Sequence, residues 1–450
     1  MEKHRTFIFD SYRFDKNTKT LVLRYSYDNK LFFDETLEFP TDKKFSNDEL
    51  VALDNVFKYL HLAAGVSYYK LFVPPEIVVK TMTLNKEQAE FFNNFYRNGL
   101  GEFSYRNNIT DLWERIKFPY ATTTEEKSKS FNVDFELKKR IIIPIGGGKD
   151  SAVTLEVVGK HYKDLLLCSI GIAKPIEDII KISGRKYFRV YRTIPKTLLD
   201  LNKILDVIGG YNGHIPISGI VAFILVAASI IYEFDTVLMS NERSANVGNV
   251  NFNGITINHQ WSKSLEFEKS INIFVKKYIL DNFNYISFLR PLSEIHIAKL
   301  FANFTKYHGV FVSCNSSFKI EKRVKRWCCN CPKCRFAFLI LSVYIRKNEL
   351  TEIFGKDMLD DERQLYGFME LCGLENHKPF ECVGEVEESV YAMLNTDGSF
   401  NSDCIVKKIR AMLKDHDVAK LRKTLFTPTD EHMLTNELSK ILNDAVSRIY

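Results

Sequence analysis

The sequence lacks several features that would each place it in a particular class of protein. It shows no internal repeat, so no repeat architecture is expected, and residues 1–5 lead into a mixed, strand-like stretch rather than the apolar core of a secretory signal. Its formal net charge is only +6 over 450 residues, and the basic residues are spread along the chain. No basic stripe or nucleic-acid-binding module is present, so no nucleic-acid partner is indicated. We expect a cytoplasmic globular protein of two or three domains.

Long hydrophobic runs are also scarce. Only residues 215–232, about 18 residues, approach the lower limit for crossing a bilayer. This run contains Pro216 and Gly219, and it lacks the flanking basic and aromatic anchors of a membrane span. We therefore predict a helix buried against a parallel sheet, and no membrane partner.

The sequence does contain a glycine-rich turn between an apolar run and a helical pattern. Residues 141–145, Ile-Ile-Ile-Pro-Ile, have the β-branched character of a buried strand. Three glycines follow, and an apolar-periodic run then starts at Asp150 and Ser151, where we expect a capping residue. Backbone N–H groups in such a turn can approach an anion without steric clash, and the helix dipole favours negative charge there. The alternative is a glycine-rich strand-to-helix turn with no ligand.

The spacing distinguishes between kinds of nucleotide loop. A Walker loop requires Ser or Thr after its lysine, but Asp150 follows Lys149, and the dinucleotide pattern fails because no glycine lies three residues after Gly148. The stretch resembles the Ser-Gly-Gly-x-Asp-Ser loop of the N-type ATP pyrophosphatases, the PP-loop superfamily. The matching residues are Gly147, Gly148, Asp150 and Ser151. Gly146 replaces the first serine, so one hydroxyl ligand to the phosphate is missing.

The order of the segments predicts an α/β fold. After the central strand, strand-like segments recur at 165–170, 187–192 and 236–240, separated by helical patterns. This alternation is typical of a doubly wound parallel sheet, with ligands at the carboxyl ends of its strands. The resemblance to the ATP pyrophosphatases implies the sheet of that superfamily.

Three regions are predicted along the chain. The first, residues 1–125, is an N-terminal α+β module with a short antiparallel sheet before residue 40 and a helix over 50–66. A polar linker at 122–139 leads into the ATP pyrophosphatase domain, residues 135–345, which includes the cysteine-rich segment. A mainly helical, charged region follows at 346–450.

A long polar connection, residues 241–268, leaves the 236–240 strand. It carries potential acids, bases and anion ligands, namely Glu242, Arg243, His259 and Lys263. A polar connection at the ligand-binding edge of a parallel sheet is a candidate substrate loop. A solvated surface loop is the alternative.

Four of the nine cysteines are clustered in the stretch Cys-Cys-Asn-Cys-Pro-Lys-Cys. Clustering suits a metal site in a reducing cytosol better than a disulfide framework. Four thiolates, at Cys314, Cys328, Cys331 and Cys334, are enough for a tetrahedral structural zinc site, with Cys329 pointing away. An iron–sulfur cluster, a redox pair and free core cysteines stay open, because thiolate spacing alone does not identify the ion.

The order of these motifs resembles two related families. The nucleotide loop, the segment 212–216, an apolar helix, the segments 239–244 and 290–294, and a cysteine knuckle follow one another as in cyano-deazaguanine synthases. The chain is more similar to the UDP-N-acetylmuramoyl-L-alanyl-L-glutamate epimerases of bacterial cell-wall synthesis, over roughly residues 5–390. The segments that carry this similarity are 61–70, 99–105, 144–151, 212–216, 239–245, 258–267, 314–315, 327–336 and 378–384.

The epimerase resemblance implies an isomerase of peptidoglycan precursor synthesis. ATP would adenylate the α-carboxylate of the terminal L-glutamate of a UDP-muramoyl dipeptide, and inversion would release AMP and pyrophosphate in a reaction that requires Mg²⁺. The implied phosphate ligands are Gly146, Gly147, Gly148, Lys149, Ser151 and Arg243. Asp150 would hold magnesium or position the phosphates. The candidates for proton transfer are His259, Lys263 and Glu242, with His214 in reserve.

Two other functions stay open at this point. One is a different carboxylate-activating synthetase, which would require ammonia or an amine, or a related base-modifying enzyme. The other is a nucleotide sensor without catalysis, for which the glycine at position 146 leaves room. The oligomeric state is not indicated by the sequence.

Overall fold

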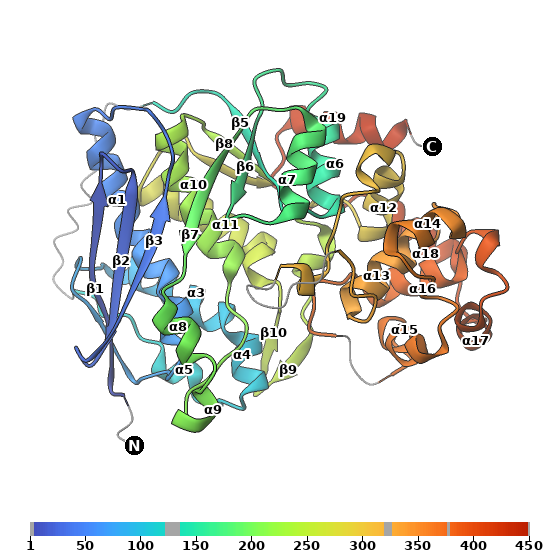
Figure 1. The fold of residues 1–450 in the computed structure, drawn as a ribbon, viewed down its shortest axis with the longest axis horizontal. Helices are drawn as coiled ribbons and strands as arrows, with labels where there is room; N and C mark the ends of the chain where they lie inside the picture. Colours follow the sequence, from blue (N-terminus) through green and yellow to red (C-terminus); the bar gives the residue numbers. More distant parts are fainter. Residues whose placement is uncertain (1–3, 122–135, 319–325, 376–378, 449–450) are drawn as a thin grey trace. The chain divides into compact units, whose positions relative to one another are not determined.

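The computed structural model of the 450-residue chain describes residues 4–121, 136–318, 326–375 and 379–448 (Figure 1). The chain divides into two compact units, each built from several stretches. The first comprises Met1–Ile141, Phe188–Val237 and Val250–Tyr285, and the second comprises Ile142–Tyr187, Leu238–Asn249 and Ile286–Tyr450. Most of the predicted linker at 122–139, and Lys378 at the start of the segment 378–384, lie outside the described residues. The three successive regions stay a prediction.

The first unit contains a mixed sheet in the order β7-β3-β2-β1-β4. Strands β1, β2 and β3 form the predicted antiparallel arrangement, drawn in blue in Figure 1, and β4 pairs with β1 in parallel. Strand β7 adds to the other edge, antiparallel to β3. The bounds are β1 Thr6–Asp15, β2 Thr20–Tyr27, β3 Leu31–Glu38, β4 Glu76–Val79 and β7 Tyr187–Thr193, with a separate hairpin of β9 Val250–Phe252 and β10 Ile255–Ile257.

Helices of the first unit bury the apolar residues of its sequence. The longest is α1, Asn47–Ala64, which begins at a capping box formed by Ser46 and Glu49 and corresponds to the helix predicted over 50–66. The apolar run 215–232 forms the buried helix α10, Ile217–Tyr232, which packs against α1 and α11. The other helices are α2 Val66–Tyr69, α3 Lys86–Gly99, α4 Gly101–Arg106, α5 Leu112–Arg115, α8 Lys196–Leu201, α9 Leu205–Ile208 and α11 Leu265–Tyr278. Within the described ranges, no helix combines the length and apolar character needed to cross a membrane.

A buried histidine in α1 makes the stability of this unit depend on pH. His61 is 0% exposed between the rings of Phe9 and Tyr25, and its Nε2 bonds to the carbonyl of Arg24 at 3.0 Å. Burial lowers the pKa of His61 from 6.5 to about 4. The unfolded chain therefore binds more protons between these two values, so the stabilisation is complete above the unfolded pKa and is lost as the pH falls toward 4.

We expect acidification from pH 7 to pH 5 to lower the free energy of unfolding by about 2 kcal/mol through His61 alone. Urea unfolding of the wild type and of His61→Leu at both pH values measures this contribution. Leucine fills a similar volume and does not titrate, so the variant should lose about 2 kcal/mol less than the wild type over this interval. Equal losses in the two proteins would show that His61 does not contribute.

The second unit contains strands in the order β11-β8-β5-β6. Strands β5 and β6 are parallel, with Ile143 opposite Leu167, and helices α6 and α7 follow them as in a β/α alternation. The predicted α/β class is confirmed, together with the helical C-terminal region. The strand bounds are β5 Ile141–Pro144, β6 Leu166–Ile170, β8 Thr236–Met239 and β11 Asn284–Ser287.

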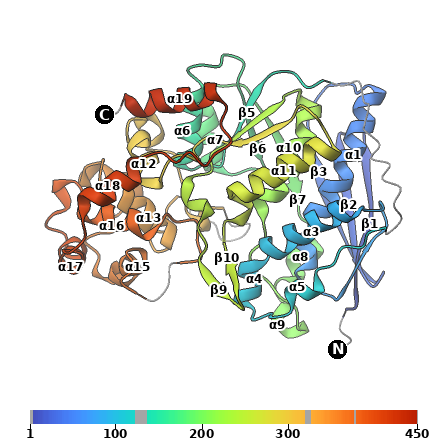
Figure 2. The ribbon, with the colours of Figure 1, turned by 180° about the vertical axis from the view of Figure 1, so that it is seen from behind.

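Helices make up the rest of the second unit. Among them, α13, α16 and α18 pack together in the C-terminal region, drawn in orange to red in Figure 2. The bounds are α6 Lys149–Val158, α7 Lys174–Ser183, α12 Glu294–Ala302, α13 Pro332–Leu341, α14 Lys347–Phe354, α15 Leu365–Leu371, α16 Val386–Leu394, α17 Cys404–Met412, α18 Val418–Phe426 and α19 Asn436–Ser447. Ser293 caps α12, because its side chain accepts a hydrogen bond from the backbone N–H of His296.

Candidate functional site

The glycine-rich turn of the second unit disfavours a side chain at two of its positions. Gly147 has a φ of +83°, and a Cβ there would lie 3.1 Å from Pro175. A Cβ at Gly148 would lie 2.9 Å from the hydroxyl oxygen of Ser313. At Gly146 no atom lies within 4 Å of such a Cβ. The space around this position would therefore accept a serine, and glycine is not required there for steric reasons. The turn thus presents its main chain directly before helix α6.

The start of α6 corrects one expectation. The helix begins at Lys149, its N-cap is Gly148, and no side chain caps it. Asp150 and Ser151 lie inside the first turn instead of preceding the helix, because the chain already becomes helical at Lys149. The backbone N–H groups at this end therefore have no side-chain cap, which suits an external anion.

Lys149 lies between two carboxylates. Its Nζ is 2.5 Å from Asp150 Oδ1 and also forms a close ion pair with Glu294, from the first turn of α12. Lys149 is 4% exposed and Glu294 is 6% exposed. Burial opposes the charge on Lys149, but Asp150 and Glu294 together raise its pKa above the usual value. Glu294 was not predicted as a site residue, because nothing in the segment 290–294 marks it as a partner of Lys149.

The acidic side chains around Lys149 and Glu294 carry more negative charge than the single ammonium of Lys149 can neutralise. Burial raises the pKa of Glu294, and the negative charges of Asp150, Glu242 and Glu388 raise it further against the effect of Lys149. Glu388 accepts a hydrogen bond from the backbone N–H of Glu294 at 2.6 Å, and burial raises its pKa to about 7. Such a group of carboxylates has a deficit of positive charge, which a bound divalent cation would offset.

Arg243 makes its contacts elsewhere in the second unit. Its guanidinium donates to the carbonyls of Thr424 and Thr427, each at 3.4 Å, and lies 4.0 Å from Glu385. Its charge also acts on Glu388. The structure therefore joins Arg243 to the end of α18 and to the carboxylates of α16.

A second group of candidate residues lies in the first unit. Glu102, in α4, forms a close hydrogen bond with the Nδ1 of His259 and lies 3.5 Å from the Nδ1 of His214. The two imidazole rings are 4.5 Å apart, centre to centre. Arg106 Nε also pairs with Glu102 at 2.5 Å. Glu102 lies in the segment 99–105 that carries the family similarity, but its role was not predicted from the sequence.

Burial and charge set the protonation of this group. Burial would raise the pKa of Glu102, but the hydrogen bond from His259 and the positive charges around it hold the pKa below its usual value. Burial lowers the pKa of His214 to about 3, helped by His259, Lys263 and Lys70 and opposed by Glu102. Glu102 is therefore an anion that can orient His259, and His214 is neutral.

The connection 241–268 contains more regular structure than a substrate loop was expected to have. Two short 3-10 helices, Arg243–Asn246 and Trp261–Lys263, flank the β9–β10 hairpin. Asn253 and Gly254 form the hairpin turn with φ values of 51° and 78°. Asn-Gly is a strong sequence signal for such a turn, so the hairpin was detectable from the sequence. Glu242 and Arg243 belong to the second unit, whereas His259 and Lys263 belong to the first.

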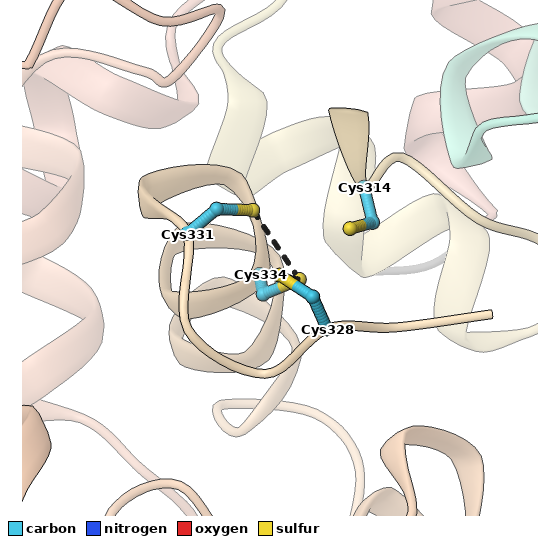
Figure 3. A group of neighbouring side chains, drawn as sticks. All are labelled: Cys314, Cys328, Cys331 and Cys334. Carbon is cyan, nitrogen blue, oxygen red and sulfur yellow. Dashed lines mark hydrogen bonds between the residues drawn. The ribbon is translucent and has the colours of Figure 1, made fainter. Parts of the chain in front are cut away.

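Four cysteines meet in the second unit (Figure 3). The sulfur atoms of Cys314, Cys328, Cys331 and Cys334 all lie within 4.8 Å of one another. The Sγ of Cys334 is 3.5 Å from that of Cys331 and 3.7 Å from that of Cys328. Cys329, with a φ of 50°, turns its sulfur toward the carbonyl of Phe354, so the expectation that it points away is confirmed. Four converging thiolates have the chemistry of a closed structural metal site.

Comparison with known proteins shows the family. The MurL N-terminal domain matches residues 1–288, and the MurL C-terminal domain matches residues 310–424. The chain belongs to the MurL epimerase family. Three relatives named UDP-N-acetyl-alpha-D-muramoyl-L-alanyl-L-glutamate epimerase support this: a Xanthomonas oryzae protein, 36% identical over 90% of both chains, a Micromonospora protein, 36% identical over 97% of both, and a Salinispora tropica protein, 38% identical over 86% of this chain and 84% of its own.

The groups of candidate residues fall in different ranges of the two family matches. The range matched by the MurL N-terminal domain contains the glycine-rich turn and the Glu102–His214–His259 group. The MurL C-terminal domain contains the four cysteines. The two matched ranges therefore include the glycine-rich turn, the Glu102 group and the four cysteines, whereas Glu294 lies between them.

Proposed function

We propose that this chain inverts the terminal L-glutamate of UDP-N-acetylmuramoyl-L-alanyl-L-glutamate in an ATP-dependent reaction of peptidoglycan precursor synthesis. The observation that carries this proposal is the sequence identity of 36–38% between this chain and three proteins named as epimerases of this substrate, over 86–97% of this chain. The buried groups near the glycine turn and around Glu102 are of the types that activation of a carboxylate and proton transfer require.

Activation solves the main chemical difficulty. A carboxylate makes the adjacent Cα–H a very weak acid, because its conjugate base would carry a second negative charge. In the proposed first step, an oxygen of the glutamate α-carboxylate attacks the α-phosphorus of ATP, and the bond from that phosphorus to the bridging oxygen breaks. Pyrophosphate leaves, and the acyl-adenylate that forms no longer carries the carboxylate charge, so its Cα–H is more acidic.

The nucleotide loop has the groups for this first step. The main-chain N–H groups at Gly147 and Gly148, together with the start of α6 and Ser151, bind the departing pyrophosphate. Lys149 neutralises negative charge on the phosphates. Asp150 would hold the magnesium ion, which would supply further charge neutralisation when bound. With this assignment, the fold that we propose for the second unit is that of the PP-loop ATP pyrophosphatases.

Proton transfer follows activation. A general base removes the Cα proton of the acyl-adenylate, an acid returns a proton to the opposite face, and water hydrolyses the adenylate to give the D-glutamyl product and AMP. We assign the base to His259, because Glu102 holds one nitrogen of its ring and so fixes its orientation. Lys263 and His214 belong to the same group of side chains, because the charges of Lys263 and His259 both lower the pKa of His214.

The test of this function is incubation of the purified protein with ATP, magnesium and the L-glutamyl nucleotide, followed by chiral analysis of the glutamate. We expect D-glutamate, with AMP and pyrophosphate formed in equal amounts and no need for ammonia. A requirement for ammonia would indicate an amide- or nitrile-forming synthetase. ATP binding without AMP formation would indicate a sensor.

We propose that the four cysteines hold a structural zinc ion. Four soft thiolate ligands in a closed group suit zinc, which would tie the segment around Cys314 to the start of α13. Such an ion would contribute to folding rather than to the reaction, because no ligand position is left for substrate.

Replacement of one ligand should therefore cost stability. In Cys331→Ser we expect loss of the one equivalent of zinc found in colourless wild-type protein, and a lower melting temperature, because structural zinc sites contribute about 10–16 kcal/mol of binding energy in small zinc domains. Metal analysis and thermal unfolding measure both effects. Cys329→Ser is the matched control, since Cys329 lies outside the group of four, and it should keep its zinc. A brown sample containing iron would contradict the assignment.

A further inference from the structure

Lys70 is a buried cation that has no counter-ion among the residues that the structure describes. The side chain follows α2 in the first unit, and the residue is 7% exposed. Its Nζ donates hydrogen bonds to the Oδ1 of Asn212 at 2.5 Å and to the carbonyl oxygen of Gly213 at 3.0 Å, both of which are neutral. Within the described ranges, no carboxylate pairs with it. Burial accordingly lowers the pKa of Lys70 to about 8.

An ammonium in this position is costly unless an anion joins it. The two hydrogen bonds use two of its three donors and supply no negative charge. Glu102, the carboxylate of the neighbouring histidine group, is already paired with His259 and Arg106. The local balance of charge is therefore positive.

A ligand can approach this ammonium along the segment that holds it. Asn212 and Gly213 are exposed, and His214, which follows them, is partly exposed. The charge of Lys70 acts on His214, and His214 in turn lies beside Glu102 and His259. An anion bound at Lys70 would thus lie next to the residues assigned to proton transfer.

We propose that Lys70 binds the side-chain carboxylate of the substrate's terminal glutamate. This inference rests on the proposed function and adds a specificity site to it. A single ammonium with one donor left matches a singly charged carboxylate. A diphosphate calls for several cations or backbone amides. Anchoring the side-chain carboxylate also leaves the α-carboxylate as the group that is free to be adenylated.

The test compares two substrates in the wild type and in Lys70→Met. One substrate is the L-glutamyl nucleotide, and the other is its L-glutaminyl analogue, whose side-chain carboxamide carries no charge. We expect the variant to lose at least about 30-fold in kcat/KM for the glutamyl substrate, mainly through KM, because a buried charge pair loses one partner. For the glutaminyl analogue, the loss in kcat/KM should be clearly smaller, about 10-fold or less, since its carboxamide oxygen can accept one hydrogen bond from the ammonium but forms no charge pair with it. Lys80→Met, at an exposed lysine that pairs with Asp10, is the matched control.

Each outcome decides the inference. An equal loss on both substrates, or a loss confined to kcat, overturns the carboxylate anchor and indicates a structural or proton-transferring lysine. If Lys70→Met does not fold, the wild type alone provides the test, because KM for the glutamyl substrate must then rise above pH 8 while that for the glutaminyl analogue stays constant. A wild type that does not convert the glutamyl nucleotide overturns the proposed function itself, and the anchor with it.

Discussion

Asp150→Asn should abolish formation of AMP and pyrophosphate. The carboxylate of Asp150 lies in the first turn of α6 and contacts the ammonium of Lys149, at the position assigned to magnesium and the phosphates. Asparagine keeps the shape and removes the charge, so the group that would hold the cation becomes neutral. We expect the rate of pyrophosphate release to fall by at least about 100-fold, as when one preorganised electrostatic group is removed.

The measurement is pyrophosphate release with ATP, magnesium and the L-glutamyl nucleotide, together with calorimetry of ATP binding. Asp444→Asn is the matched control, because Asp444 is exposed on α19 of the same unit. It should retain wild-type activity. An Asp150→Asn enzyme as active as this control would rule out the role assigned to Asp150.

His259→Ala should separate activation of the substrate from inversion. Because His259 is assigned to proton transfer and the nucleotide loop to adenylation, the variant should still release pyrophosphate. Exchange of the Cα proton with deuterated solvent should slow by about 100- to 10,000-fold, the usual contribution of a general base. Mass spectrometry of the recovered glutamate measures the exchange.

Two further variants make this result specific. His161→Ala replaces an exposed histidine and should exchange at the wild-type rate. Lys263→Ala tests the other candidate near His214, and it should reduce exchange less than His259→Ala does. If exchange is normal in His259→Ala and lost in Lys263→Ala, the base is Lys263.

Buried charges without partners of opposite sign destabilise the fold, but they favour binding of a ligand that supplies the opposite charge. Around Glu294, four carboxylates outnumber the nearby cations. The hydrogen-bond partners of Lys70 in the described part of the chain are both neutral. Each arrangement is unfavourable in the protein alone. Each becomes favourable when a ligand of opposite charge binds, which is why such groups mark functional sites.

Local sequence was sufficient for the parts of this protein that depend on neighbours in the chain. The glycine turn between β5 and α6, the buried helix α10 and the cap at Ser293 all follow from periodicity and from the steric properties of individual residues. The four cysteines were also predictable, because three lie within seven residues of one another and the ligand type is distinctive.

Only the tertiary structure showed which distant residues meet. Glu102, His214 and His259 come from three separate stretches of the first unit, and Lys149 meets Glu294 across 145 positions of sequence. No periodicity encodes such pairs, because they arise when helices and strands pack and bring their ends together. Burial then decides which of these side chains hold or release a proton, and burial is a property of the folded chain rather than of any one segment.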